Sequence, residues 1–436
     1  MTFVSTRNPS GAAYSLAEAL RLGPAPDGGL FMPQCLEPLP ETVLAGFVDA
    51  DLKAVGYEVL RHLLQQDLSP QTIREIAVDA LNFEIPLAPV APNIGVLEIF
   101  HGPTLAFKDV GARFLARLLA ATRDEENDTA STVLVATSGD TGGAVAQAFH
   151  GVSGTRVAIL YPAGKVSPVQ ERQFTTLGGN VRAFAVDGAF DDCQRLVNES
   201  FADRDLAESV RLTSANSINV GRLLPQIIYY FHAAAEAKRA GHDKILFCTP
   251  SGNFGNLTAG LLAKKLGLEA RFVAATNAND VVPIYLETGR YEPRPSLATI
   301  SNAMDVGRPN NFIRIQHLYD HDVDAIRRDV VGCRFSDEET RATMARIDES
   351  FGYVLDPHTA VGWSAVEKAL PGLEAGTYGI VLGTAHPAKF GEVVEPALGR
   401  TIPLPEGLAR HLDKPVRSEP LAPDAADLRR ALLSWS

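Results

Sequence analysis

Residues 244–267 read KILFCTPSGNFGNLTAGLLAKKLG, an apolar run followed by a glycine-rich turn and a stretch with helical spacing. This order is typical of one strand–helix unit of a parallel sheet, in which a buried strand is apolar on both faces. Gly252 and Gly255 let the backbone approach an anion, toward which the first N–H groups of the helix point. The stretch therefore predicts a parallel strand that ends in a phosphate-binding turn, and an ordinary tight turn is the alternative.

The spacing within this turn narrows the kind of phosphate that it could bind. It matches neither GxGxxG nor GxxxxGK[ST], so the dinucleotide fingerprint and the P-loop are both excluded. The loop itself contains no lysine, which suits a monophosphate ester better than a triphosphate. A monophosphate ester is therefore the predicted ligand.

The same alternation of apolar runs and helical stretches continues on both sides of this segment. The apolar runs are residues 132–137, 156–162, 180–187, 270–276 and 379–383. Continuous apolar strands separated by helices indicate a parallel sheet with helices on both faces. Residues 1–95 differ, because helical spacing at 43–64 and 70–81 lies between proline-rich connectors.

At 436 residues the chain is long enough for two or three domains. We expect an α/β protein with two parallel-sheet lobes and a helical N-terminal section. The expected segments are 1–95 as the N-terminal helical section, 96–130 as part of the large lobe, 131–240 as the small α/β lobe, and 241–436 as the large α/β lobe with a C-terminal tail. That tail either packs loosely or ends in a helix over AADLRRALLS.

The charge balance excludes several classes of partner. Lys and Arg number 40 and Asp and Glu 52, so the formal net charge is −12. A surface that acidic does not attract nucleic acid or anionic lipid in bulk, although a local basic pocket is compatible with it. The sequence contains no run of 18 apolar residues, so it predicts no membrane span. The N-terminus lacks the apolar core of a secretory signal. We therefore expect a cytoplasmic protein whose four scattered cysteines are reduced and fill the core.

A lysine stands at a predicted helix start in IFHGPTLAFKDVGARFLARLLAA, residues 99–121. Pro103 interrupts the chain, and a helix is predicted from about Phe107 onward. Lys108 lies in the first turn, where the helix dipole and burial both favour the neutral amine that a Schiff-base nucleophile requires. The alternative is an exposed lysine at a helix start, and the local sequence by itself favours that alternative.

A second strand, loop and helix occur in TVLVATSGDTGGAVAQAF, residues 132–149. The hydroxyls of Ser138 and Thr141, together with backbone N–H groups, could hold a carboxylate at the helix N-terminus. Capping of the helix by Ser138 or Asp140 is the alternative.

Two further polar segments carry hydrogen-bond donors. TSANSINVGR, residues 213–222, contains three of them, Asn216, Asn219 and Arg222. GIVLGTAHPAKF, residues 379–390, is a strand that ends in a polar turn with Thr384. An asparagine-rich turn and a surface loop are the respective alternatives.

His317 and His321 have the i, i+4 spacing of metal ligands, but no third ligand lies nearby in the sequence, so we expect no metal site.

Taken together, these segments indicate more than each does singly. A lysine at a helix start, a monophosphate-binding turn and a second anion-binding loop equip a chain for pyridoxal phosphate and an amino-acid substrate.

Several motifs resemble the threonine synthase family and occur in its chain order. HGPTLAFKD at 101–109 is similar to the cofactor-lysine motif of that family. The other similar motifs are STRN at 5–8, APDGGLFMP at 25–33, TSGDTG at 137–142, YPAGKVSPVQERQ at 161–173, SINVGR at 217–222, GNFGN at 252–256 and GTAHPAKF at 383–390. The length and the helical N-terminal section suit the bacterial–fungal branch.

The resemblance implies a fold-type-II pyridoxal-phosphate enzyme with a tryptophan synthase β-like fold. The implied activity is that of a lyase which eliminates phosphate from O-phospho-L-homoserine and adds water, giving L-threonine. Carried over position by position, Lys108, within the segment 96–130, forms the Schiff base with the cofactor. Thr384 hydrogen-bonds the pyridine nitrogen. The residues implied to hold the cofactor phosphate are Gly252, Asn253, Phe254, Gly255 and Asn256.

The resemblance also implies a substrate site. Ser138 and Thr141 fall where the family grips the substrate, whereas Asn216 and Arg222 fall where it holds the substrate phosphate. Two further donors are included with them, Asn219 from the same segment and Lys165 from the matching basic segment. Asp140 is a departure, because many fold-type-II relatives have Asn here, close to the phenolic oxygen of the cofactor. Two anions at that place would repel each other unless they share a proton.

Two alternatives stay open at this point. A fold-type-II threonine or serine dehydratase would share the lysine and the turn but needs no site for a second phosphate, so Asn216 and Arg222 argue against it. A non-catalytic paralogue would not need Lys108, GNFGN and Thr384 to be intact. The expected partner is a small-molecule substrate, with no nucleic acid and no membrane, and the protein is expected to be a monomer or a homodimer.

Overall fold

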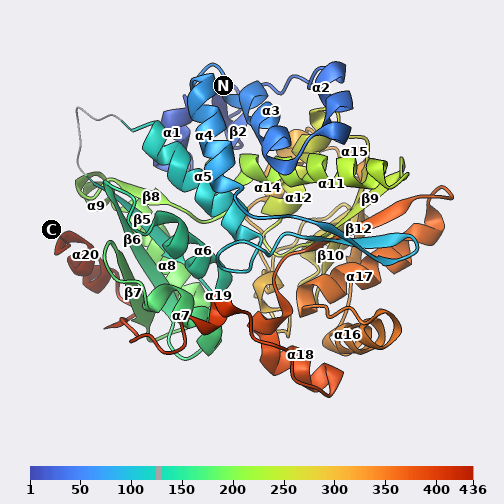
Figure 1. Ribbon diagram of the computed structural model, residues 1–436. Helices are drawn as coiled ribbons and strands as arrows, with labels where there is room; N and C mark the ends of the chain where they lie inside the picture. The colour runs from blue at the N-terminus through green and yellow to red at the C-terminus, as the bar shows by residue number, and fades with distance from the viewer. Residues whose placement is uncertain (124–129, 436) are drawn as a thin grey trace. The chain divides into compact units, whose positions relative to one another are not determined.

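The computed structural model describes residues 1–123 and 130–435, and its chain divides into two compact units. Unit 1 comprises Met1–Met32, Pro103–Arg222 and Leu404–Ser436, and unit 2 comprises Pro33–Gly102 and Leu223–Pro403. Figure 1 shows the ribbon and labels many of the helices and strands of both units. Each unit contains its own sheet, which confirms the predicted α/β class with parallel sheets.

Unit 1 is built on a five-stranded sheet of order β13-β7-β6-β5-β8, in which every pairing is parallel. The strands are β5 (Ser131–Ala136), β6 (Thr155–Pro162), β7 (Val181–Val186), β8 (Leu212–Ser214) and β13 (Glu419–Leu421). From its second residue onward, every residue of β5 is buried. Burial on both faces explains the continuous apolar runs from which three of these strands were predicted.

The helices of unit 1 are short to medium in length. They are α1 (Leu16–Leu22), α5 (Lys108–Ala121), α6 (Asp140–Phe149), α7 (Pro168–Thr175), α8 (Phe190–Ala202), α9 (Arg204–Ser209), α10 (Val220–Leu223, whose last residue lies in unit 2), α19 (Glu406–Ala409) and α20 (Ala425–Leu433). α8 and α20 share a core with β5, β6 and β7 that includes Leu196 and Leu428. The C-terminal tail therefore ends in a packed helix, the second of the two predicted possibilities.

Unit 2 is built on a six-stranded sheet of order β11-β10-β9-β12-β4-β3. The strands are β3 (Leu87–Ala91), β4 (Ile94–Glu98), β9 (Ile245–Pro250), β10 (Arg271–Thr276), β11 (Val330–Arg334) and β12 (Tyr378–Gly383). Only β3 is antiparallel to its neighbour. β12 pairs with β9 on one side and β4 on the other, so the carboxyl ends of these three strands lie at one edge of the sheet.

Helices of unit 2 surround this sheet and its N-terminal segment. They are α2 (Glu41–Gly46), α3 (Leu52–Leu64), α4 (Pro70–Ala80), α11 (Ile227–Arg239), α12 (Gly255–Lys265), α13 (Val281–Thr288), α14 (Phe312–Leu318), α15 (Val323–Asp329), α16 (Asp337–Phe351), α17 (Pro357–Ala369) and α18 (Gly391–Leu398). α17 packs on β9, β10 and β12 and places Trp363 in the core. A separate two-stranded sheet joins β1 (Phe3–Ser5) and β2 (Phe31–Pro33).

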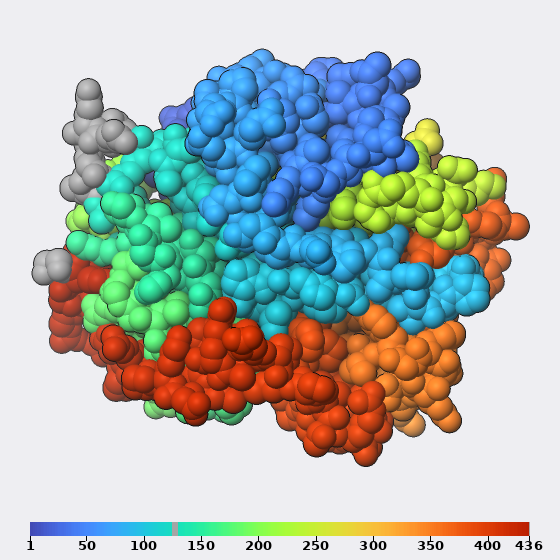
Figure 2. All heavy atoms as spheres, in the orientation of Figure 1, coloured from blue at the N-terminus to red at the C-terminus, as the bar shows by residue number. Residues whose placement is uncertain are grey.

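The compact units divide the chain at positions other than the predicted segment boundaries. Residues 103–123 belong to unit 1 and not to the larger unit, and residues 404–435 also join unit 1. There β13 pairs with β7, and Arg182 forms an ion pair with Glu419. Figure 2 shows the C-terminal segment, in red, against the green segment that carries α7 and β7. Strand pairing between distant segments accounts for the C-terminal difference, and no local sequence pattern indicates such a pairing.

Two local predictions were wrong. The stretch 43–64 is not one helix, because α2 ends in a short 3₁₀ turn at Phe47–Asp49 and α3 begins anew at Leu52. The Asp51 carboxylate accepts the backbone N–H of Ala54, which starts the second helix. Cys35 is exposed, whereas the other three cysteines are buried as predicted. No described helix combines the length and the apolar surface that a bilayer crossing requires.

Helix α20 offers a matched test of the packing of unit 1. Leu428 is fully buried, whereas Leu433 on the same helix is 44% exposed. Leu428→Ala should destabilise unit 1 by about 2–5 kcal/mol, because it leaves a cavity between α20, α8 and the sheet. Leu433→Ala should change stability by about 0.5 kcal/mol or less. Urea unfolding followed by tryptophan fluorescence measures both, and equal effects would contradict the packed position of α20.

Candidate active site

Lys108 is the first residue of α5, as the sequence predicted. The preceding turn contains Leu105 with a positive φ of 57°. The buried carboxylate of Asp109 accepts the backbone N–H of Thr104 at 2.8 Å and its hydroxyl at 2.7 Å. These two bonds close the turn and fix the point at which the helix begins. The Lys108 side chain is only 16% exposed, so the alternative of an exposed lysine is wrong.

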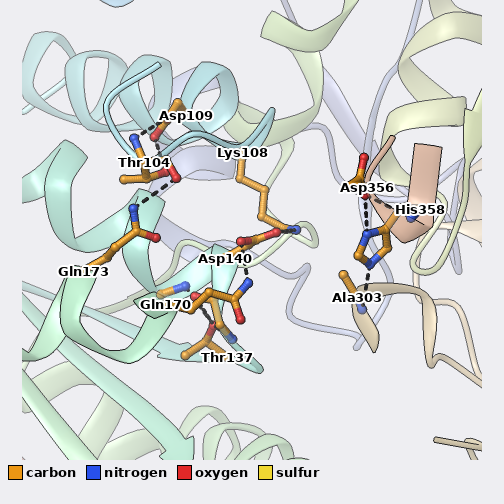
Figure 3. Close-up of polar contacts among 12 residues, drawn as sticks. Thr104, Lys108, Asp109, Thr137, Asp140, Gln170, Gln173, Ala303, Asp356 and His358 are labelled. Atoms are coloured by element: carbon orange, nitrogen blue, oxygen red, sulfur yellow. Dashed lines mark hydrogen bonds and ion pairs between the residues drawn. The ribbon is translucent and has the colours of Figure 1, made fainter. Parts of the chain in front are cut away.

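The amine of Lys108 lies beside a buried carboxylate. Its Nζ is 3.5 Å from Oδ2 of Asp140, the first residue of α6, and the Asp140 side chain is 4% exposed (Figure 3). Oδ1 of Asp140 accepts a hydrogen bond from Nε2 of Gln170 at 2.8 Å. The sequence predicted a neutral amine from the helix dipole and burial, but this carboxylate opposes both effects and favours the ammonium. The structure therefore adds an ion pair that sequence analysis did not predict.

The loop before α6 carries two hydroxyls, those of Ser138 and Thr141, that are not used to cap the helix. The helix is capped by Gly139, with no side-chain cap, so capping by Ser138 or Asp140 does not occur. Instead, Oγ1 of Thr137 accepts the backbone N–H groups of Gly139 and Gly142 at 3.0 and 2.8 Å. In the described chain neither the Ser138 nor the Thr141 hydroxyl has a hydrogen bond, and both residues are half-buried. This loop can offer hydroxyl and backbone donors to a small carboxylate.

The three donors predicted in residues 213–222 have different surroundings. Asn219 is fully buried, and its amide bonds the carbonyls of Leu20 and Ser214 and the N–H of Gly221. We therefore assign Asn219 to holding this loop in place. Asn216 donates to the Ala136 carbonyl at 3.0 Å, while its Oδ1 is buried with no hydrogen bond in the described chain.

Arg222 is buried, so it is not a surface arginine. It is 4% exposed and donates to the carbonyl of Ala215. Gly111 of α5 packs against it so closely that a Cβ there would lie 2.9 Å from Arg222 Nε. Lys165, by contrast, is exposed in the turn after β6.

The GNFGN turn of unit 2 follows β9 and opens α12. Phe254 adopts a left-handed backbone conformation with φ 62°, and α12 starts at Gly255. The first backbone bond of the helix runs from Thr258 N to Phe254 O, so the three N–H groups before it, from Gly255 to Leu257, precede the hydrogen-bonded ladder. Three such N–H groups at the start of an 11-residue helix can bind an anion.

The neighbouring residues hold this turn rigidly. A Cβ on Gly252 would lie 2.6 Å from the Ala303 carbonyl oxygen, so the segment around Ala303 packs directly on the turn. Oδ1 of Asn253 accepts the backbone N–H of Asn310 at 2.6 Å. His358 accepts the N–H of Ala303 at Nε2, at 3.2 Å, while its Nδ1 lies 2.8 Å from Oδ1 of Asp356 (Figure 3). This buried pair therefore fixes the segment that backs the turn.

The side-chain amide of Asn256, in the same turn, has one bonded atom and one without a hydrogen bond. Its Oδ1 accepts the hydroxyls of Tyr229 and Tyr230, at 2.6 and 2.9 Å. Burial raises the pKa of the Tyr230 phenol far above its usual value, which keeps it a neutral donor. Nδ2 of Asn256 is buried and has no hydrogen bond in the described part of the chain. Such a donor is costly unless a ligand satisfies it.

Thr384 stands at the same edge of the sheet of unit 2. It directly follows β12, which pairs in parallel with β9, so Thr384 and the GNFGN turn both extend from carboxyl ends of neighbouring strands. Thr384 is 6% exposed, and no hydrogen bond of its hydroxyl occurs in the described chain. The predicted cofactor residues thus lie in unit 2, except for Lys108 in unit 1.

Sequence analysis missed several residues of these sites. Gln170 and Gln173 lay in the motif at 161–173, but only its lysine was singled out. The Asp356–His358 pair follows the pattern of a helix N-cap, since Asp356 caps α17, and that pattern could have drawn attention to it. Among the described residues no group of three or more His, Cys, Asp or Glu is arranged to hold a metal ion.

Comparison with known protein families agrees with these features along nearly the whole chain. The family profile described as "Pyridoxal-phosphate dependent enzyme" matches residues 94–383. Profiles described as "Threonine synthase N terminus" and "Threonine synthase, C-terminal" match residues 2–81 and 359–432.

Individual relatives extend over the same length. The threonine synthase of Serratia marcescens is 44% identical over 420 residues, which is 96% of each chain. The crystal structure of threonine synthase from Escherichia coli superposes with a TM-score of 0.93 at 42% identity, and covers all of both chains. The pyridoxal-phosphate-bound threonine synthase from Brucella melitensis also has a TM-score of 0.93, at 34% identity over 100% of this chain and 99% of that one. The chain therefore belongs to the threonine synthase family of pyridoxal-phosphate-dependent enzymes.

Proposed function

We propose that this chain catalyses the threonine synthase reaction, in which O-phospho-L-homoserine and water give L-threonine and phosphate. The observation that carries the proposal is a buried lysine in the family's lysine motif, in a chain that matches threonine synthases from end to end. Incubation of the purified protein with O-phospho-L-homoserine should yield threonine and inorganic phosphate in equal amounts. Formation of 2-oxobutyrate instead of threonine would favour a dehydratase.

The residues of unit 2 fit the pyridoxal phosphate cofactor of this family. The first N–H groups of α12 suit a monophosphate ester, and the buried Nδ2 of Asn256 supplies a further donor. The proposed phosphate ligands are Gly252, Asn253, Phe254, Gly255 and Asn256, and the Thr384 hydroxyl is the proposed partner of the pyridine nitrogen. When bound, the cofactor supplies an electron sink for the carbanions that form beside the substrate's amino group.

Lys108 is the proposed acid–base group of the reaction as well as the covalent anchor of the cofactor. Once released, its Nζ would take protons first from Cα and then from Cβ of the substrate. Asp140, at 3.5 Å, would stabilise the ammonium that each of these transfers produces. Its position therefore supports a lysine that cycles between two protonation states.

The donors around α6 and α10 support a phosphorylated amino-acid substrate. The Ser138 and Thr141 hydroxyls would receive its carboxylate. Arg222 and Asn216 would hold its phosphate, since a guanidinium matches phosphate oxygens in pairs. Lys165, which is exposed, is an auxiliary cation in this proposal. A buried arginine has no role for a dehydratase, whose substrates carry no phosphate.

The surroundings in which we place the protein follow from its composition. We propose a cytoplasmic enzyme that acts on a small molecule, as a monomer or a homodimer, without nucleic acid or membrane partners. The net charge of −12 and the free state of all four cysteines support this proposal.

Substitution of Gly252 tests the phosphate-binding turn. Gly252→Ala places a Cβ 2.6 Å from the Ala303 carbonyl oxygen, so the turn must shift. We expect the Kd for pyridoxal phosphate to rise about tenfold or more, as the turn absorbs strain of roughly 1–3 kcal/mol. Gly46→Ala, where the added Cβ meets nothing within 4 Å, is the control and should bind normally. Unchanged affinity in Gly252→Ala would argue that the cofactor phosphate binds elsewhere.

Substitution of Lys108 tests the covalent link. Lys108→Ala should lose the visible absorbance of the linked cofactor and lower turnover by at least about 10³-fold, because both the anchor and the base are removed. Borohydride treatment of the wild-type protein should fix the cofactor on a peptide within residues 101–113. Lys53→Ala, at an exposed position of α3, should behave as wild type. Cofactor found on another lysine would refute the assignment.

Substitution of Arg222 tests the substrate phosphate site. Arg222→Met should lower kcat/KM for O-phospho-L-homoserine. The corresponding loss of transition-state stabilisation should be roughly 2–5 kcal/mol, the scale of a charged pair broken in a desolvated site. The cofactor absorbance should survive, and any slow deamination of serine should change little. Arg195→Met, which removes an arginine from an exposed ion pair, is the control. Equal losses on both substrates would mean that Arg222 has a structural role only.

A further inference from the structure

Helix α7 presents two glutamines one turn apart to the two loops that hold the ion pair. Gln170 and Gln173 are both buried, with exposed fractions of 2% and 0%. Nε2 of Gln170 donates to Asp140 Oδ1 at 2.8 Å, and Nε2 of Gln173 donates to the Thr104 carbonyl at 3.1 Å (Figure 3). One rigid helix therefore contacts both the loop that carries Asp140 and the turn that carries Lys108.

The orientation of the Gln170 amide is defined by its other contacts. The Ser167 hydroxyl donates to Oε1 of Gln170 at 3.2 Å, so the NH₂ group faces Asp140. A Cβ on Gly139 would lie only 2.5 Å from that Oε1, so the backbone of Gly139 lies close to the amide and any larger residue there would displace it. The donor is neutral and bonds the oxygen of Asp140 that does not face Lys108, so it stabilises the carboxylate without competing for the lysine.

Gln173 acts on the other partner of the pair. Its bond to the Thr104 carbonyl complements the two bonds that the N–H and hydroxyl of Thr104 donate to Asp109. The turn before α5 is therefore held on its donor side by α5 itself and on its acceptor side by α7. Lys108 follows directly from this turn.

Charged groups on the elements packed around the pair also have partners of their own. On α7, Glu171 accepts the Tyr161 hydroxyl and Arg172 donates to carbonyls of residues 412 and 414. On α1, Glu18 is bound in the capping box of its own helix. Asp109 bonds Thr104, and Arg222 bonds the Ala215 carbonyl. Asp140 is the carboxylate recorded against the Lys108 amine within unit 1.

We propose that Gln170 is a positioning residue that holds the Asp140 carboxylate in place beside Lys108 and thereby sets the balance between the ammonium and the free amine. Gln173 has the separate task of fixing the turn from which Lys108 extends. The inference rests on the proposed function only in taking Lys108 as the cofactor lysine. It assigns a role within that site to the motif at 161–173.

The test measures the protonation of Lys108 directly, in the full chain stripped of cofactor. Trace acetylation of Lys108 is followed by mass spectrometry of the 101–113 peptide as a function of pH. In Gln170→Leu the midpoint of labelling should move to lower pH by about 0.5–1 unit, because the Asp140 carboxylate is no longer held beside the amine and stabilises the ammonium less. In Gln173→Leu the midpoint should stay at the wild-type value, while the cofactor is lost more readily.

Two further variants make the outcome decisive. Gln71→Leu removes an exposed glutamine that bonds Glu75 on α4, and should leave the midpoint unchanged. Asp140→Asn should shift the midpoint in the same direction as Gln170→Leu, and adding Gln170→Leu to it should produce no further shift. Should Gln170→Leu fail to fold, Gln170→Met replaces it in the same measurements.

A midpoint that does not move in Gln170→Leu or Gln170→Met would overturn the proposal, as would a full further shift in the double variant. The proposed function fails differently. In that case bound pyridoxal phosphate does not protect Lys108 of the wild-type protein from acetylation, whatever the glutamine variants do.

Discussion

The 3.5 Å contact between Lys108 Nζ and Asp140 Oδ2 is the interaction on which the arrangement of the surrounding loops of unit 1 depends. Both side chains are largely buried, and a buried charged pair is stable only when its geometry is fixed and its remaining lone pairs are bonded. The parallel strand β5 and the start of α6 bring Asp140 into place, and the Thr104–Asp109 turn does the same for Lys108. α7 adds a hydrogen bond to the second oxygen of Asp140.

The net charge of −12 raises the question of how this protein would bind an anionic cofactor and an anionic substrate. The candidate sites contain local hydrogen-bond donors, so they need no basic surface around them. In unit 2 these are the backbone N–H groups at the start of α12 and the amide of Asn256. In unit 1 they are the loop before α6 and the buried guanidinium of Arg222. Fixed dipoles and one desolvated cation act over a few ångströms, where the average surface charge has little influence.

Patterns of local origin were predictable from the sequence, and non-local pairings were not. Strands such as β5 and β9 are apolar on both faces, so their runs stood out, and the glycines and hydroxyls that follow them marked the ligand-binding loops. The ion pair of Lys108 was missed, because its partner Asp140 lies 32 positions away in the sequence. Asn219 looked like a ligand donor, but its amide holds two carbonyls of its surroundings. Likewise, the pairing of β13 with β7 carried the C-terminal tail into unit 1.

Two glycines near the ion pair show that residues without a reactive group are also constrained. Gly111 lies against the guanidinium of Arg222, and Gly139 lies against the amide of Gln170. In each case a Cβ would come within 3.0 Å of the polar side chain, so a larger residue would push that side chain out of place. DVGAR and SGDTG therefore each pair a glycine with a polar group supplied by another segment. These two segments thus encode contacts with other parts of the chain as well as the reacting groups, and a side chain as remote in sequence as Gln170 can be as constrained as the lysine it supports.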